Sequence, residues 1–233
     1  MIYNDKQMSK LFAKKLLEDV VTMTSEAKTS HVGGCLSCLD VVSVLFTKIL
    51  NIDKKNPKSK KRDRFILSKG HTAAIIYSAL ANKGFFPRKW LSTFIENGTK
   101  LPGHIDHKVP GVEFSTGSLG HGLSVGLGMA IAMRDKNIKS NVYVLVSDGE
   151  MNTGSTWESI MFAAHHKVSN LICIVDKNKI QSFGKTKDII NLDPLHKKWE
   201  SFGWNTYDID GHNLSQIKKA LLSAKKSKQK PSV

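Results

Sequence analysis

The sequence has few cysteines, no long apolar run and no sign of an export signal. Three cysteines in 233 residues are too few for the disulfide framework of a small secreted domain. Cys35 and Cys38 form a lone C-x-x-C, without the second pair that a zinc site needs. No apolar run approaches the roughly 20 residues that span a bilayer, and MIYNDKQMSK at the start has no apolar signal region. We therefore expect a cytoplasmic protein with no membrane partner.

Acidic residues are scarce relative to basic ones. The 35 lysines and arginines against 20 aspartates and glutamates give a formal net charge of +15. Such a charge suits nucleic acid or small anionic ligands. The basic runs, such as KKNPKSKKRDR at 54–64, have no interleaved aromatics, and no RNP, zinc-finger or KH pattern is present. We expect no nucleic-acid partner; a solvated basic surface is the first interpretation, and attraction of phosphorylated small molecules is the second.

Apolar segments alternate regularly between helical and strand patterns. Helices are predicted over 7–27, 39–50, 71–81, 122–133, 155–166 and 214–226, and strands over 64–68, 142–146, 171–176 and 206–210. Uniformly apolar strands that alternate with helices are typical of an α/β fold, with a mostly parallel sheet and helices on both faces. No internal repeat or linker is evident, so residues 1–233 are expected to form a single domain. Residues 98–120, with five glycines and two prolines, are predicted to be a functional loop.

The strand over 142–146 ends at Ser147-Asp148-Gly149-Glu150, a corner with two carboxylates around a glycine. In an open parallel sheet, ligands bind beyond the carboxyl ends of the strands. Asp148 offers an oxygen ligand of the kind that Mg²⁺ or Ca²⁺ prefers. Gly149 lets the backbone approach a ligand, and the following helix offers N–H groups to an anion. Since a carboxylate repels an anion unless a cation lies between them, the corner predicts a metal-bridged phosphate; the alternative is an ordinary Asp N-cap.

The next strand strengthens the metal interpretation. Asn178 follows Asp148 by thirty positions, about one strand–helix–strand unit, so its amide oxygen is expected at the same sheet edge. Asp148, Asn178 and a turn carbonyl, together with two phosphate oxygens and a water, would complete an octahedron around Mg²⁺.

This spacing resembles the thiamine diphosphate motif, and four longer segments resemble the N-terminal part of transketolases, in the family's order. The segments are TSHVGGCLSCLDVVSVLF, DRFILSKGHTAAIIYSAL, LPGHIDHKVPGVEFSTGSLGHGLSVGLGMA and SDGEMNTGSTWESIMFAAHHKVSNLICIVDKNKIQSFG. The resemblance covers roughly residues 8–232. It is closest to the split form of the family, in which the N-terminal, diphosphate-binding half is a polypeptide of its own.

The resemblance implies an enzyme of carbohydrate metabolism, a transferase that moves a two-carbon ketol unit from a ketose phosphate to an aldose phosphate. It implies thiamine diphosphate and Mg²⁺ (or Ca²⁺) as cofactors. It also implies a hetero-oligomer with a C-terminal, pyrimidine-binding subunit, because that half supplies the activating glutamate in the family. Two alternatives remain: half of another thiamine diphosphate enzyme, such as a deoxyxylulose phosphate synthase, and a non-catalytic paralogue that acts as a binding or scaffold protein.

The resemblance also assigns roles to single residues. The implied metal ligands are Asp148, Asn178 and the carbonyl of Ile180. The implied cofactor-binding residues are His71, Gly117, Leu119, Gly149 and Asn178. The implied catalytic residues are His31, His71 and His104. Each of these histidines lies in or beside a glycine-containing turn, where it can reach a ligand and move protons near neutral pH.

Some positions depart from the family pattern. Ser147 replaces the first glycine of GDG, and Thr153 replaces a glutamate associated with contacts between paired active sites. Glu150 is interpreted as an exposed acid in the first turn of the next helix, favoured by the helix dipole.

KPSV at 230–233 matches the start of the last strand of the family's N-terminal half. Related domains continue further and carry another histidine near the diphosphate, so no activity of the chain alone is expected.

Overall fold

The computed structural model describes residues 5–233, which divide into two compact units. Unit 1 contains the chain up to Arg62, together with Gly70–Gly117 and Ile209–Lys219; unit 2 contains Asp63–Lys69, Ser118–Asp208 and Ala220–Val233. The first four residues of MIYNDKQMSK, on which the prediction of a missing signal region partly depends, lie outside the described residues. Of the helices in residues 5–233, none combines the length and apolarity needed to cross a bilayer.

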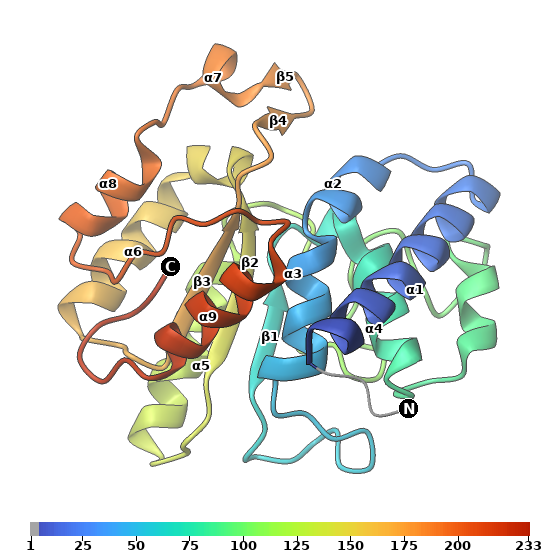
Figure 1. Cartoon of the computed structure of the whole chain (residues 1–233), viewed down its shortest axis with the longest axis horizontal. Helices are drawn as coiled ribbons and strands as arrows, with labels where there is room; N and C mark the ends of the chain where they lie inside the picture. Colours follow the sequence, from blue (N-terminus) through green and yellow to red (C-terminus); the bar gives the residue numbers. More distant parts are fainter. Residues whose placement is uncertain (1–4) are drawn as a thin grey trace. The chain divides into compact units, whose positions relative to one another are not determined.

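Unit 1 is helical. Its elements are α1 (Asp5–Glu26), α2 (Val32–Ser37), α3 (Leu39–Val44), the π-helix η1 (Leu45–Ile49), the 3-10 helices η2 (Gly70–Thr72) and η3 (Arg88–Thr93), and α4 (Ala73–Asn82). α1 packs against α3 and α4, and its buried residues Leu16, Val20 and Met23 recur at helical spacing. Figure 1 shows these three helices side by side. The predicted loop over 98–120 contains neither helix nor strand.

Unit 2 is built on a parallel sheet. Its strands β1 (Arg64–Leu67), β2 (Val142–Ser147) and β3 (Leu171–Asp176) are hydrogen-bonded in that order. Its other elements are α5 (Gly122–Asp135), η4 (Gly149–Asn152), α6 (Gly154–His165), β4 (Ile180–Gln181), β5 (Gly184–Lys185), α7 (Thr186–Ile189), α8 (Leu195–Ser201) and the end of α9 (Leu214–Lys225). All six residues of β2 are buried, as its continuous apolar run predicts. The predicted α/β class and parallel sheet are confirmed.

The core of unit 2 is formed by side chains of the sheet, α5, α6 and α8. Leu123, Leu127 and Ala130 of α5 are buried with Val142 of β2. Gly126 permits this contact, because a Cβ at its position would lie 2.5 Å from Val144 Cγ2. β4, β5 and α7 follow β3 and extend beyond its carboxyl end (Figure 1).

The predicted strand over 206–210 is wrong. The place beside β3 is taken by Ser232, which pairs with Ile172 in parallel, while Asn205 forms an isolated bridge with Ser232. Tyr207 N–H donates to the carbonyl of Val233 at 2.8 Å, and no regular strand follows in the described chain. The KPSV segment therefore pairs with the sheet, as its resemblance to a strand predicts.

Candidate functional site

Asp148 lies where β2 ends, and its side chain is only 5% exposed. Its Oδ1 accepts the Gly149 N–H at 3.0 Å, and its Oδ2 accepts the Lys179 N–H at 2.8 Å and the Thr186 hydroxyl at 3.3 Å. Burial raises the pKa of Asp148; the backbone hydrogen bonds oppose this rise, and the charge of Asp176 adds to it. A divalent cation would stabilise a buried carboxylate in these surroundings.

Asn178 lies in the turn that follows β3, and Ile180 begins β4 directly after that turn. They come close to Asp148 because β2 and β3 pair in parallel up to their last residues. Lys179 has a left-handed backbone, with φ of 67°, and its N–H donates to Asp148. The Asn178 Oδ1 accepts the Ile180 N–H at 3.0 Å. The structure thus places the two side chains and the turn carbonyl of the predicted metal set at one end of the sheet.

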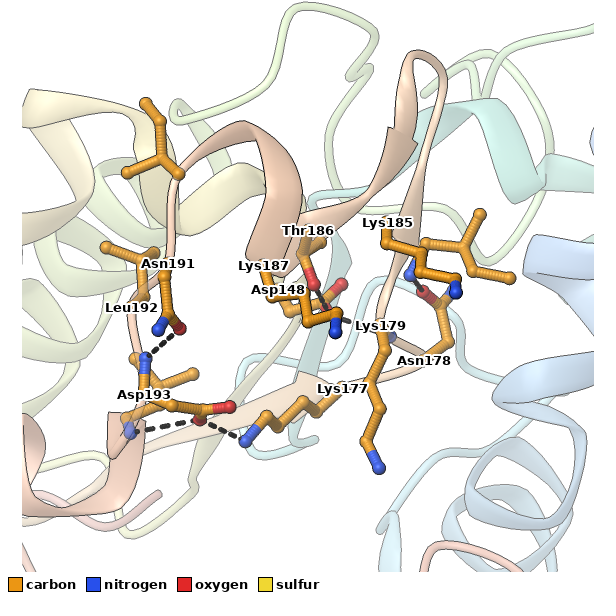
Figure 2. A pocket seen from close by; sticks show the side chains of 13 residues that line it. Asp148, Lys177, Asn178, Lys179, Lys185, Thr186, Lys187, Asn191, Leu192 and Asp193 are labelled. Atoms are coloured by element: carbon orange, nitrogen blue, oxygen red, sulfur yellow. Dashed lines mark hydrogen bonds and ion pairs between the residues drawn. The ribbon is translucent and has the colours of Figure 1, made fainter.

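A cleft of about 460 Å³ opens at this end of unit 2 (Figure 2). Its volume falls in the range of small-molecule sites, roughly 300–1,000 Å³. The predicted metal ligands Asp148, Asn178 and Ile180 line it. Four lysines also line it, namely Lys177, Lys179, Lys185 and Lys187. Lys177 forms an ion pair with Asp193, as Figure 2 shows. Oxygen ligands among several lysines suit a metal ion with a polyanionic ligand.

Glu150 is buried, which contradicts the prediction of an exposed first-turn acid. The residue is 0% exposed, and backbone and hydroxyl donors converge on its carboxylate. Oε1 accepts the Gly120 N–H at 2.8 Å and the Ser68 hydroxyl, and Oε2 accepts the Ser147 N–H at 3.4 Å. The Glu150 N–H donates in return to Ser147 Oγ at 3.2 Å. Burial raises the pKa of Glu150, and the hydrogen bonds from Ser68 and Gly120 oppose that rise.

This reciprocal pairing is the capping box, S-x-x-E, in which a serine and a glutamate three residues later bond each other's backbone. The pattern is visible at 147–150 and was the signal that could have placed Glu150. Ser147, the departure from GDG, supplies the hydroxyl. Its replacement of glycine therefore has a structural role of its own.

A buried ion pair ties two further strand ends of unit 2. Lys69, just after β1, pairs with Asp176 at the end of β3, and the two side chains are 1% and 9% exposed. The Asp176 carbonyl accepts the Asp148 N–H at 3.2 Å. Sequence patterns did not predict Lys69, because a lysine beside a glycine is ordinarily a surface residue and no local signal marks it as buried.

Unit 1 brings together the three predicted histidines. The ring centroids of His31 and His71 are 5.1 Å apart, and those of His31 and His104 are 6.3 Å apart. His71 follows Gly70, and His104 precedes Ile105, whose N–H donates to the Gly70 carbonyl at 3.1 Å. One backbone hydrogen bond therefore holds the two histidine-bearing segments next to each other.

His31 occupies a strained backbone position at the start of α2. Its φ of 75° and ψ of 6° are left-handed, which is uncommon outside glycine. Gly34 lets α2 approach the other histidines, because a Cβ there would lie 2.8 Å from Thr72 Cγ2. Burial lowers the pKa of His31, and the charge of His104 lowers it further. The neutral imidazole, which can accept a proton, is thereby favoured.

Gly117 and Leu119 lie in the TGSLG loop, on either side of the boundary between the units. Gly117 is exposed in unit 1, and a Cβ there would lie 3.4 Å from His104 Cδ2. Leu119 is half-buried in unit 2 and precedes Gly120, which is bonded to Glu150.

Comparison with known proteins points to one family. The profile of the transketolase, thiamine diphosphate binding domain, matches residues 9–233. The 6-deoxy-6-sulfo-D-fructose transketolase subunit SqwG of Clostridium sp. (strain MSTE9) is 43% identical over 204 residues, 87% of this chain and 74% of that protein. An apulose-4-phosphate transketolase subunit of Actinobacillus succinogenes is 43% identical over 213 residues, 91% of this chain and 77% of that protein.

Solved structures agree with this similarity. The transketolase of Campylobacter jejuni superposes with a TM-score of 0.92 at 31% identity, over 99% of this chain and 37% of that one. The transketolase of Leishmania mexicana gives a TM-score of 0.90 at 28% identity, over 96% and 35% of the two chains. This chain therefore spans little more than a third of the solved transketolases.

Proposed function

The chain belongs to the transketolase family, through its thiamine diphosphate-binding domain, and from this premise we propose that it is the N-terminal subunit of a split transketolase. The proposed reaction transfers a two-carbon ketol unit from a ketose phosphate to an aldose phosphate, in the cytoplasm. The observation that carries the proposal is the cleft of unit 2, where Asp148, Asn178 and Ile180 lie among four lysines. Relatives at 43% identity that are named transketolase subunits support it.

The proposed ligand of this cleft is thiamine diphosphate with Mg²⁺ (or Ca²⁺). Asp148, Asn178 and Ile180 would hold the metal through a carboxylate, an amide and a carbonyl oxygen, which suits a hard cation. The lysines of the cleft would offset the charge of the diphosphate. The bound cofactor would supply the electron sink that ketol transfer requires. Gly149 is proposed to bind the diphosphate through its backbone.

The proposed catalytic residues are His31, His71 and His104. Their proximity in unit 1 supports a shared role. They would bind the hydroxyl groups of the sugar and move protons to and from them. The lowered pKa of His31 keeps its imidazole neutral near neutral pH, which is the form that can accept a proton. His71 is also proposed to contact the diphosphate, and Gly117 and Leu119 to lie beside the pyrimidine ring of the cofactor.

A separate C-terminal transketolase subunit is proposed as the partner, in a hetero-oligomer. Pyrimidine activation needs a carboxylate opposite the ring. Glu150 lies two residues after Asp148, and Asp176 lies two residues before Asn178. Glu150 accepts the Gly120 N–H and Asp176 pairs with Lys69, so both carboxylates are already bonded within unit 2. The names of the relatives, which are themselves subunits, support a partner that provides this group.

The test is a ketol-transfer assay with a ketose phosphate and an aldose phosphate, in the presence of Mg²⁺ and thiamine diphosphate. We expect no turnover by the purified chain and clear turnover after addition of the pyrimidine-binding half encoded by a neighbouring gene. Robust turnover by the chain alone would refute the split-enzyme proposal. Metal-dependent cofactor binding without turnover, with every candidate partner, would favour the non-catalytic scaffold.

A further inference from the structure

Gly120 is held at both of its backbone polar groups. Its N–H donates to Glu150 Oε1 at 2.8 Å, and its carbonyl accepts the Ser155 hydroxyl at 2.9 Å. Its φ is 88°, and a Cβ there would lie 2.5 Å from Thr153 Oγ1. The backbone of Gly120 therefore lies directly against the η4–α6 corner, where no larger residue fits.

Glu150 also reaches the start of α5 through Ser68. The Gly122 N–H donates to Ser68 Oγ at 3.1 Å, and the Ser68 hydroxyl donates to Glu150. A Cβ at Gly122 would lie 2.3 Å from Ser68 Oγ, so this approach too requires glycine. Glu150 is thus linked, directly or through one hydroxyl, to Gly120 and Gly122 on both sides of His121.

The chemistry of this site favours a carboxylate over an amide. Three donors converge on the two oxygens of Glu150, namely the Gly120 N–H, the Ser68 hydroxyl and the Ser147 N–H. An ionised carboxylate is acceptor-only, whereas a glutamine would present an NH₂ group to at least one of these donors. With the side chain fully buried, water cannot replace a lost partner.

Thr153 belongs to the same corner. Its hydroxyl donates to the Glu150 carbonyl at 2.8 Å, and its Oγ1 lies 2.7 Å from Thr156 Oγ1. Where the family has a glutamate, this chain therefore has a residue whose hydroxyl is used within η4 and α6.

We propose that Glu150 is a positioning residue, which fixes the Ser118–Gly122 segment against the corner that begins at Asp148. Glu150 would thereby join the loop proposed to lie beside the cofactor to Asp148, the proposed metal ligand, which lies two residues before it. The ligand part of this inference rests on the proposed function; the loop-holding part rests only on the contacts within unit 2.

The first test is amide hydrogen exchange of the full chain without cofactor. Glu150→Gln should speed exchange of the Gly120 and Gly122 amides about tenfold or more, because a buried donor loses its acceptor. The amides of β2 should exchange as in the native chain. Glu200→Gln is the matched control, since Glu200 is an exposed carboxylate of unit 2 that accepts the Thr206 hydroxyl; it should leave both amides unchanged.

The second test is thiamine diphosphate binding with Mg²⁺ and the partner subunit present. Glu150→Gln should weaken the apparent affinity about tenfold, while binding still depends on the metal. If the native enzyme binds no thiamine diphosphate, the proposed function and the ligand part of the inference fail, whereas the exchange result still decides the loop-holding part.

Two exchange outcomes would overturn the proposal. One is native protection of Gly120 in a folded Glu150→Gln protein. The other is acceleration spread evenly over β2 and α6, which would make Glu150 a general stabilising residue. Should Glu150→Gln fail to fold, Ser68→Ala removes the hydroxyl that links Glu150 to the Gly122 N–H. Faster exchange at Gly122 with native exchange in β2 would then support the proposal, and unchanged exchange at Gly122 would reject it.

Discussion

The histidine cluster of unit 1 (His31, His71 and His104) and the carboxylate corner of unit 2 (Asp148 and Glu150) are built in opposite ways. His104 is exposed and the His31 ring is only partly buried, and a backbone hydrogen bond between Ile105 and Gly70 holds the segments of His104 and His71 together. The two carboxylates are 5% and 0% exposed, and backbone N–H groups donate to both. A side chain placed by its backbone can be replaced at little cost in stability. A side chain that itself holds the backbone cannot, so its loss should affect both the local backbone and the binding of the ligand.

The largest expected effect comes from Asp148→Ala. This change removes the proposed metal ligand and the acceptor of the Lys179 N–H, so metal-dependent binding of thiamine diphosphate should be abolished. Isothermal titration calorimetry, performed with Mg²⁺ in the presence of the partner subunit, measures this loss. Removal of the metal with EDTA should abolish binding to the native protein in the same way.

Asp188→Asn is the control for Asp148→Ala, because Asp188 is an exposed carboxylate in α7, in the same part of unit 2. It should bind the cofactor as the native chain does. Unchanged affinity of Asp148→Ala, or full affinity of the native protein without any divalent metal, would remove the metal site from the proposal.

The second expected effect is on turnover. Single alanine substitutions of His31, His71 and His104 should each lower kcat/KM of the complex roughly 10²- to 10⁴-fold, the contribution of a proton-transfer group. Thermal unfolding should change little, because surface substitutions contribute within about 0.5 kcal/mol, and the left-handed backbone at residue 31 is strained with histidine as it is with alanine. His196→Ala serves as the control, since it removes a histidine of α8 that has no proposed role. A histidine whose loss lowers the melting temperature strongly but preserves turnover would instead be structural.

Local patterns in the sequence predicted β1, β2 and β3 and the proximity of Asp148 and Asn178 well. β2 and β3 could be predicted because buried parallel strands have continuous apolar runs, and the spacing then places both strand ends at one edge. The segment 206–210 has only alternating apolar residues and forms no strand, because Ser232 lies beside Ile172. That competition between distant segments leaves no trace in a local pattern.

The error at Glu150 has the same origin. The helix-dipole rule considers only the turn that follows, whereas the burial of Glu150 depends on Gly120, thirty residues earlier, and on Ser68, eighty-two residues earlier. The capping box at 147–150 was a local signal and could have been used. Lys69 had no such signal, since its burial depends on Asp176 at the end of another strand.

The third expected effect separates two adjacent glycines of α2. Gly34→Ala should lower the free energy of unfolding by about 1–3 kcal/mol, because the new Cβ would lie 2.8 Å from Thr72 Cγ2 and must displace α2. Gly33→Ala, where nothing lies within 4 Å, should instead raise it by roughly 0.5–1 kcal/mol through helix propensity. Urea denaturation of the two variants measures both values. Equal effects at the two positions would mean that α2 is not packed closely beside the histidine cluster.

The smallest expected effect concerns the titration of His31. Burial and the charge of His104 lower the pKa of His31 below its usual value of about 6.5. In the pH window between that usual value and the lowered one, the unfolded chain binds more protons than the folded chain at this site. The free energy of unfolding should therefore fall as the pH falls through this window.

His104→Gln removes the second cause and leaves the first. The pKa of His31 should therefore rise toward its usual value without reaching it, and the loss of stability on acidification should become smaller. An NMR titration of the imidazole C–H signals of the free chain measures the pKa, with His212→Gln as the control. In the carboxylate corner, burial acts with the opposite sign and raises the pKa of Asp148 and Glu150, since it favours the neutral form in both regions. An unchanged pKa of His31 in His104→Gln would show that the two rings do not interact in solution. The histidines of unit 1 would then not influence one another as the residues of the hydrogen-bonded corner do.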